Sequence, residues 1–220
     1  MVHLDRDGNV YVLTLGDGEN RFNPSSVAAL GKVLDEVENA DPPCALVTVA
    51  VGKFWSNGLD LDWMRAHPDD MPRFMAGVKA LFARTLALPV PTVAAIAGHA
   101  FGAGAVLALA HDFRVMRADR GYFCLPEVDI QIPFTAGVAG LVQARLTPQV
   151  AHEAMTTGRR FGGPDALGAA IVDAIAADGE VTATAVELVR PLAGKDRPTL
   201  GAIKTVMYAP VLAALAEVRG

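Results

Sequence analysis

Three features of this sequence predict an α/β fold: strand-like apolar runs alternate with segments of helical period, these runs end in turns, and 52% of the 220 residues are apolar. Residues 44–51 and 92–96 are continuous apolar runs, as expected of strands buried on both faces of a parallel sheet. Parallel strands need crossover connections, which are usually helices. The chain is long enough to bury a large core in one α/β domain.

The first predicted elements are a hairpin and a capped helix. Residues 2–4 and 10–15 flank an Asp-Gly turn at 7–8, which is a hairpin pattern. Asn23 suits the cap of a helix, and Pro24 suits its first position. The helix keeps its period at the apolar positions Val27, Leu30, Val33, Leu34 and Val37.

Two strand-turn-helix units follow. The strand at 44–51 leads through a loop at 52–60 into a short helix, and then into a longer helix at about 71–88. The strand at 92–96 leads through a glycine turn into an Ala- and Leu-rich helix that ends near His111. Both turns therefore fall at the carboxyl ends of parallel strands, the edge at which α/β proteins bind ligands.

The rest of the chain is predicted to be mostly helical. Short strands are expected around residues 114–116 and 122–124. Helices are expected near residues 137–145, 148–157, 165–169, 181–192 and 199–215. No exact repeat or long linker interrupts this order, which favours a single domain.

Composition restricts the class of protein. The net charge of −5 and the absence of a basic block disfavour nucleic acid as a partner. Apolar runs break off before the ~20 residues that span a bilayer, and the first residues do not resemble a signal peptide. We therefore expect a soluble, cytoplasmic protein without a membrane partner. Cys44 and Cys124 lie in apolar runs without metal-ligand spacing, so they are predicted to be buried thiols, and no metal site is expected.

The two glycine turns, at residues 56–60 and 98–105, predict chemistry by backbone groups. Glycine lets a ligand approach the backbone closely, and the first N–H groups of a helix have no acceptor within it. Two such N–H groups, if they converge, form an oxyanion hole. The spacing matches neither the dinucleotide motif GxGxxG nor a phosphate loop, which argues against NAD or ATP as the ligand.

Four segments resemble, in order and spacing, motifs of the enoyl-CoA hydratase/isomerase (crotonase) family. They are residues 52–61 (GKFWSNGLDL), 97–104 (AGHAFGAG), 126–130 (PEVDI) and 161–173 (FGGPDALGAAIVD). Within this family the chain is most similar to the plant-type Δ3,Δ2-enoyl-CoA isomerases. The resemblance implies a crotonase (ClpP-like) fold over residues 1–220: a spiral of ββα units to about residue 175, then a helical part at about 176–220, shorter than usual.

The resemblance also implies a ligand and an assembly. The substrate would be an acyl-CoA thioester, with coenzyme A as part of the substrate and no separate cofactor, and the assembly a homotrimer or hexamer. The family's oxyanion donors fall on the backbone N–H groups of Leu59 and Ala103. The residues expected to surround the substrate are Ser56, Asn57, Gly58, Asp60, Leu61, Gly102, Gly104 and Val106.

The acid-base groups indicate which reaction of the family to expect. Hydratases carry two glutamates, whose positions here are occupied by Val106 and Glu127. One carboxylate is sufficient to move a proton from C2 of a 3-enoyl thioester to C4, so Glu127 is the predicted base of an isomerase. Hydration, thioester hydrolysis and a non-catalytic acyl-CoA-binding scaffold remain open alternatives.

Other polar residues are left open between binding and structural roles. Arg21, Lys53, Arg65 and Arg73 are candidate contacts to the CoA phosphates, although exposed positions without a ligand explain them equally well. For Asp129 a structural role is favoured over a chemical one.

Overall fold

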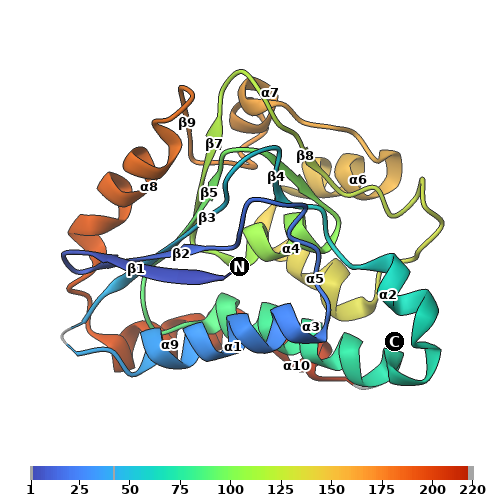
Figure 1. The fold of residues 1–220 in the computed structure, drawn as a ribbon, viewed down its shortest axis with the longest axis horizontal. Helices are drawn as coiled ribbons and strands as arrows, with labels where there is room; N and C mark the ends of the chain where they lie inside the picture. The colour runs from blue at the N-terminus through green and yellow to red at the C-terminus, as the bar shows by residue number, and fades with distance from the viewer. Residues whose placement is uncertain (1, 42, 218–220) are drawn as a thin grey trace.

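The computed structural model describes residues 2–41 and 43–217, and a six-stranded sheet lies at its centre (Figure 1). In spatial order the strands are β1 (His3–Asp7), β2 (Val10–Thr14), β3 (Ala45–Val49), β5 (Thr92–Ile96), β7 (Phe113–Arg117) and β9 (Ala174–Ala176). β1 pairs with β2 in antiparallel fashion, and every other neighbouring pair is parallel. The predicted hairpin and parallel sheet are confirmed.

A second, smaller sheet was not predicted as such, although one of its strands, Phe123–Cys124, falls within the strand predicted at 122–124. Its three parallel strands are β4 (Phe54–Ser56), β6 (His99–Phe101) and β8 (Phe123–Cys124). Each of them follows a strand of the large sheet, namely β3, β5 and β7, so the chain repeats a strand-strand-helix unit. The predicted loop at 52–60 and the predicted glycine turn therefore each contain a strand. β4 and β6, which were not predicted, have three residues each, too few for a periodic pattern to appear in the sequence.

The helices surround the two sheets. They are α1 (Pro24–Glu38), α2 (Leu61–Ala66), α3 (Met71–Ala87), α4 (Ala103–Ala110), α5 (Ala136–Arg145), α6 (Pro148–Thr157), α7 (Gly163–Gly168), α8 (Val181–Val189), α9 (Arg197–Met207) and α10 (Ala209–Ala216), with 3₁₀ turns at Pro68–Asp70 and Arg190–Leu192. α1 begins as predicted. The Asn23 side chain accepts a hydrogen bond from the Ser26 N–H, and Pro24 occupies the first turn.

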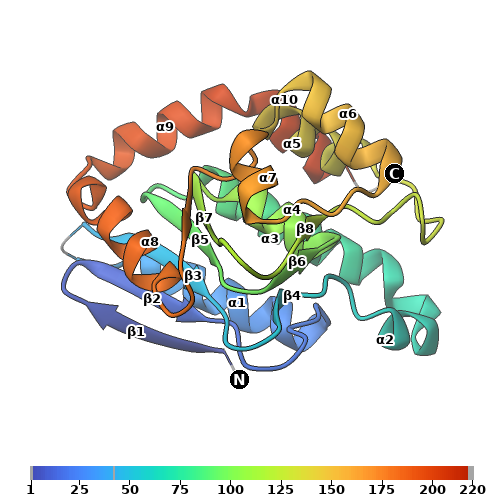
Figure 2. The same ribbon diagram turned by 90° about the horizontal axis from the view of Figure 1, so that it is seen from above.

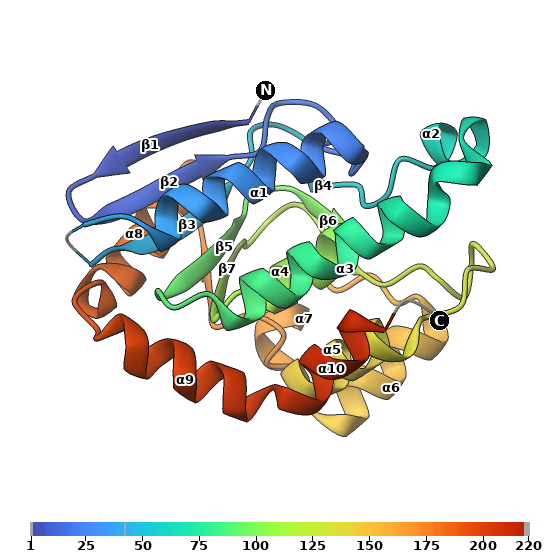
Figure 3. The same cartoon turned by 90° about the horizontal axis from the view of Figure 1, so that it is seen from below.

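The central strands build a core on each face of the large sheet, because alternate side chains point to opposite faces. On one face Val47 and Val93 pack with Val186 of α8 (Figure 2). On the other face Leu46 and Ile96 belong to the larger core beneath α1 and α3, which lie side by side (Figure 3). Strands buried on both faces explain the continuous apolar runs of the sequence.

The C-terminal helix predicted at 199–215 is two helices. α9 and α10 meet at Tyr208 with a bend of 75°. Pro210 lies in the first turn of α10, and its ring has no N–H and would clash with the preceding turn of a continuous helix. The bend lets α10 contact α3 and α5 (Figure 3). In the described part of the chain, no single helix is long and apolar enough to cross a membrane.

Candidate active site

The two glycine turns meet in space. Gly58, in the turn after β4, has a φ of +79°, which favours glycine. A Cβ atom at this position would lie 2.8 Å from the carbonyl oxygen of Phe101 and 3.2 Å from the backbone nitrogen of Ala103. No side chain fits there. The turn after β4 is therefore packed directly against the turn that opens α4.

Both predicted donor N–H groups are free of backbone acceptors within the described residues. Ala103 is the first residue of α4, so its N–H has no partner inside the helix. Leu59 pairs with Phe22 in an isolated bridge, in which Gly58 accepts from the Phe22 N–H and Asp60 donates to the Phe22 carbonyl. The N–H of Leu59 faces away from that bridge, because neighbouring peptide groups of an extended chain point in opposite directions.

Glu127 lies beside the second turn. It follows β8, and its Oε1 atom is 3.5 Å from the position that a Cβ on Gly102 would occupy. Gly102 has a φ of +51°, a backbone conformation that glycine adopts without strain, and a Cβ there would be in ordinary contact with the carboxylate. The Oε2 atom of Glu127 is buried and has no hydrogen-bond partner among the described residues. Burial raises the pKa of Glu127 to about 7, because removal of water disfavours the charged form.

A pocket of about 380 Å³ brings these groups together. Seven of the residues predicted for the site line it, namely Asn57, Gly58, Leu59, Leu61, Gly102, Ala103 and Glu127. A carboxylate with a pKa near 7 next to two free N–H donors can exchange protons with a substrate whose developing negative charge those donors stabilise.

The other four predicted residues do not line this pocket. Ser56 is buried, and its Oγ donates to the Asn20 carbonyl at 2.8 Å and accepts from the Gly58 N–H at 3.2 Å. Gly104 is packed against Ser56. Asp60 caps α2 by accepting from the Trp63 N–H, and Val106 is buried in the core. Ser56, Gly104 and Asp60 hold the two turns in place.

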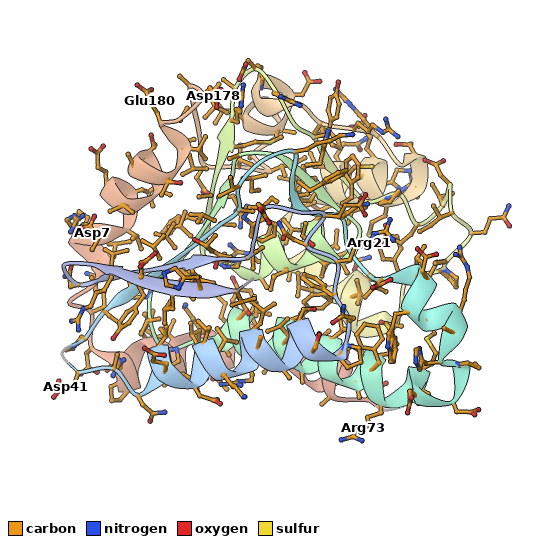
Figure 4. The ribbon with its side chains drawn as sticks, in the orientation of Figure 1. Asp7, Arg21, Asp41, Arg73, Asp178 and Glu180 are labelled. Carbon is orange, nitrogen blue, oxygen red and sulfur yellow. The ribbon has the colours of Figure 1, made fainter. Side chains whose placement is uncertain are left out.

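Two of the four candidate cations lie at the pocket. Arg21 and Arg65 line it, and both form ion pairs with Asp62, at 3.1 and 2.8 Å. Lys53 and Arg73 do not line it. Figure 4 shows Arg73 pointing away from the molecule, whereas Arg21 lies beside the start of α2.

The sequence interpretation missed several lining residues, namely Asp62, Phe101, Pro126, Ile130 and Ile132. Ile130 and Ile132 were detectable as large apolar side chains two residues apart just after Glu127, and they stay 46% and 36% exposed. Among the residues that the structure describes, no three His, Cys, Asp or Glu side chains come together as metal ligands would.

The chain matches known proteins over nearly its whole length. Residues 5–220 match the enoyl-CoA hydratase/isomerase family. Peroxisomal enoyl-CoA delta isomerase 2 of Arabidopsis thaliana is 37% identical over 89% of this chain and 86% of its own. Carnitinyl-CoA dehydratase of Escherichia coli is 32% identical over 93% of this chain and 79% of its own.

A solved structure agrees with this assignment. The enoyl-CoA isomerase of Mycobacterium tuberculosis has a TM-score of 0.89 at 29% identity, over 97% of this chain and 93% of its own. The predicted crotonase fold is confirmed.

One prediction needs correction. The expected cytoplasmic location is contradicted, because the Arabidopsis relative is named as peroxisomal. Organelle addresses are short signals read by receptors, so composition and hydropathy do not report them. The fold, the paired glycine turns and these similarities agree, and the chain belongs to the enoyl-CoA hydratase/isomerase family of enzymes.

Proposed function

We propose that this protein converts 3-enoyl-CoA thioesters into 2-enoyl-CoA thioesters, with Glu127 as the acid-base group. The observation that carries the proposal is the difference in exposure and pairing between the two carboxylates that line the pocket. Asp62 is exposed and paired with Arg21 and Arg65, whereas Glu127 has a buried oxygen without a partner. A single available carboxylate with a raised pKa fits a reaction that moves one proton within the substrate.

The proposed mechanism has two proton transfers. The thioester oxygen accepts hydrogen bonds from the N–H groups of Leu59 and Ala103, which stabilise the negative charge that develops when a proton leaves C2. Glu127 takes that proton, and the electron pair of the C–H bond delocalises over the double bond and the carbonyl as a dienolate. The same carboxyl group then returns the proton to C4, which moves the double bond to C2–C3. No water is consumed.

Arg21 and Arg65 are proposed to bind the phosphates of the CoA portion. They lie at the same pocket as the two donors, and guanidinium groups bind phosphate well. Their present pairing with Asp62 orients both side chains until the ligand arrives. We further propose a homotrimer or hexamer, which light scattering at several protein concentrations tests.

Hydration is the second candidate, and the similarity to a dehydratase favours it over the remaining alternatives. Hydration of a double bond requires a group that activates water and a proton donor for the adjacent carbon, which two carboxylates supply. Val106 stands at the position of the first hydratase glutamate, and it is buried and apolar. The chain therefore has one of the two groups.

The test compares wild-type rates on trans-3-enoyl-CoA and trans-2-enoyl-CoA of equal chain length. We expect isomerisation to be faster than hydration. A ratio of isomerisation to hydration below one would reject the proposal in favour of hydration. Release of free CoA would identify a hydrolase instead, and binding without turnover of any thioester would identify a scaffold.

A further inference from the structure

The direction of the Leu59 N–H is set from outside its own turn. A peptide group is planar and trans, so this N–H points opposite to the carbonyl of Gly58. That carbonyl accepts a hydrogen bond from the Phe22 N–H at 2.7 Å. On the other side of Leu59, the N–H of Asp60 donates to the Phe22 carbonyl at 2.9 Å. Phe22 therefore holds both peptide groups that flank Leu59.

Asn20, two residues before Phe22, ties this segment to β4. Its backbone has a φ of +50°, a left-handed conformation in which asparagine is enriched among residues other than glycine. From there its Nδ2 atom donates to the carbonyl oxygens of Phe54 and Trp55, both at 3.1 Å, and of Gly16 at 3.4 Å. An amide nitrogen carries two hydrogens, so these acceptors use its whole donor capacity. The Asn20 side chain thus joins the segment after β2 to the strand that leads into the turn.

The main chain of Asn20 reaches the turn as well. Its carbonyl accepts from Ser56 Oγ at 2.8 Å, and the same Oγ accepts from the Gly58 N–H at 3.2 Å. Ser56 is buried, so water does not replace these bonds. Beside it, the Asn57 N–H donates to the Glu19 carbonyl at 2.8 Å. The two segments therefore form one hydrogen-bonded unit with Asn20 at its centre.

The second donor needs no support of this kind. Ala103 is the first residue of α4, so the helix itself fixes the direction of its N–H. At the same helix end, the Val106 N–H donates to the Gly102 carbonyl at 3.0 Å. Leu59 lies outside the helices, in an isolated bridge. Loss of the Asn20 contacts should therefore disturb one oxyanion donor and spare the other.

From these contacts, and resting on the proposed function, we infer that Asn20 is a positioning residue of the oxyanion hole. It does not line the pocket, so it acts through other residues. Through Phe22, Ser56 and β4 it keeps the Leu59 N–H directed at the thioester oxygen. Asparagine suits the position because a left-handed backbone and an uncharged amide that donates to the carbonyl oxygens of β4 are both needed there.

Asn20→Asp tests the assignment by turnover. The variant keeps the size of the side chain and tolerates the left-handed backbone, but its carboxylate only accepts hydrogen bonds and faces the carbonyl oxygens of Phe54 and Trp55. We expect kcat on trans-3-enoyl-CoA to fall by about tenfold to 100-fold, less than when a donor is deleted, with little change in KM.

Infrared spectroscopy of a bound thioester reports the donors directly. Hydrogen bonds from N–H groups lower the stretching frequency of a carbonyl group, and hexanoyl-CoA labelled with carbon-13 at its carbonyl makes that band visible. A saturated chain has no double bond to move, so the measurement does not depend on isomerase activity. We expect a downshift of the band in wild type and a smaller one in Asn20→Asp, because only the Ala103 N–H stays in place.

Asn39→Asp is the matched control. The Asn39 Nδ2 also donates to a main-chain carbonyl, that of Asp35 at 2.7 Å, at the exposed end of α1. This variant should keep the wild-type kcat and band. Asn20→Gly keeps the left-handed backbone without adding a charge, and it should show the smaller downshift even where Asn20→Asp does not fold.

The outcomes separate the positioning role from the proposed reaction. A wild-type band in folded Asn20→Asp or Asn20→Gly would overturn the inference, and so would a fall in kcat without a change of the band. No downshift in wild type would overturn it together with the oxyanion assignment. The expected bands in a protein that does not isomerise 3-enoyl-CoA would support the positioning role and reject the isomerase function alone.

Discussion

Glu127 and Asp112 are two partly buried acidic side chains, and they differ in their hydrogen-bond partners. Asp112 Oδ2 accepts hydrogen bonds from the Thr92 N–H at 2.8 Å and from Lys204 Nζ at 2.7 Å. Lys204 Nζ also donates to the carbonyl oxygens of Leu88 and Val90, at 2.8 and 3.0 Å. Glu127 has a buried oxygen without any protein partner in the described part of the chain.

The difference distinguishes a charge that holds the fold from a group that is available for chemistry. Burying a charge is costly unless hydrogen bonds compensate it, and the Asp112–Lys204 pair has that compensation. The pair anchors α9 to the residue just before β7 and to the segment before β5. Glu127 lacks it, so burial raises its pKa to about 7. Under the proposed function, a bound substrate would supply the missing contact.

His111, like Asp112, is a titratable side chain with hydrogen-bond partners in the protein. Its Nδ1 donates to the Leu107 carbonyl at 2.8 Å, and its Nε2 accepts from the Thr48 hydroxyl at 2.8 Å. Burial lowers the pKa of His111 to about 4, so the ring stays neutral near pH 7. A titratable side chain with both nitrogens satisfied has a structural role.

Removing the available carboxylate gives the largest expected effect. Glu127→Gln keeps the shape but cannot accept a proton, so kcat should fall by about 100-fold to 10,000-fold with little change in affinity for a saturated acyl-CoA. Asp129→Asn, an exposed acid of the same segment, is the matched control and should keep its turnover. Turnover close to wild type in Glu127→Gln would remove Glu127 as the base.

Removing a donor N–H is expected to have the next largest effect. Ala103→Pro deletes the N–H at the first position of α4, where proline is tolerated, and kcat should fall by about 100-fold to 1,000-fold. Ala103→Gly keeps the N–H and should stay near wild type. Full turnover in a proline variant with a wild-type circular dichroism spectrum would contradict the oxyanion assignment.

Breaking the compensated pair should affect stability instead of rate. Lys204→Met leaves the Asp112 carboxylate without its cation, and the free energy of unfolding should fall by about 3 kcal/mol in urea titrations. Turnover per folded molecule should be unchanged. Lys195→Met, at an exposed lysine, should stay within about 0.5 kcal/mol of wild type. A large loss of turnover in folded Lys204→Met would contradict a purely structural role for the Asp112–Lys204 pair.

The pH dependence of turnover and of stability has the smallest expected effect. Turnover reports Glu127 as a base, and stability reports the burial of its carboxylate. The base must be deprotonated, so kcat/KM should rise with pH and level off above about 7. The folded-state pKa is above the unfolded value, so the folded protein binds the extra proton between about pH 4.5 and 7 and loses stability as the pH rises through that range.

In Glu127→Gln the loss of folding stability between about pH 4.5 and 7 should disappear, because glutamine does not titrate. The variant should be more stable than wild type above pH 7, by at most about 3 kcal/mol, and equally stable below about pH 4.5. Thermal unfolding at pH 4.5 and pH 8 measures this difference. Equal stability of the two proteins at pH 8 would contradict the burial of an uncompensated carboxylate.

Long, uniform elements were predictable from the sequence, and short or interrupted ones were not. β5 matches the predicted strand at 92–96 residue for residue, and α1 begins at the predicted cap. β4, β6 and β9 have three residues each, too few to show a period. The break between α9 and α10 had a signal in Pro210, which a regular apolar pattern on both sides obscured.

The sequence by itself determined the family, the two glycine turns, the candidate donors Leu59 and Ala103, and the candidate base Glu127. These are local features, because a motif or a turn depends on neighbouring residues. Only the tertiary structure decided that Gly58 packs against Ala103, that Arg21 reaches the same pocket, and that the Glu127 carboxylate is buried without a partner. Such contacts join residues far apart in the chain, and a pKa depends on how much water those contacts exclude.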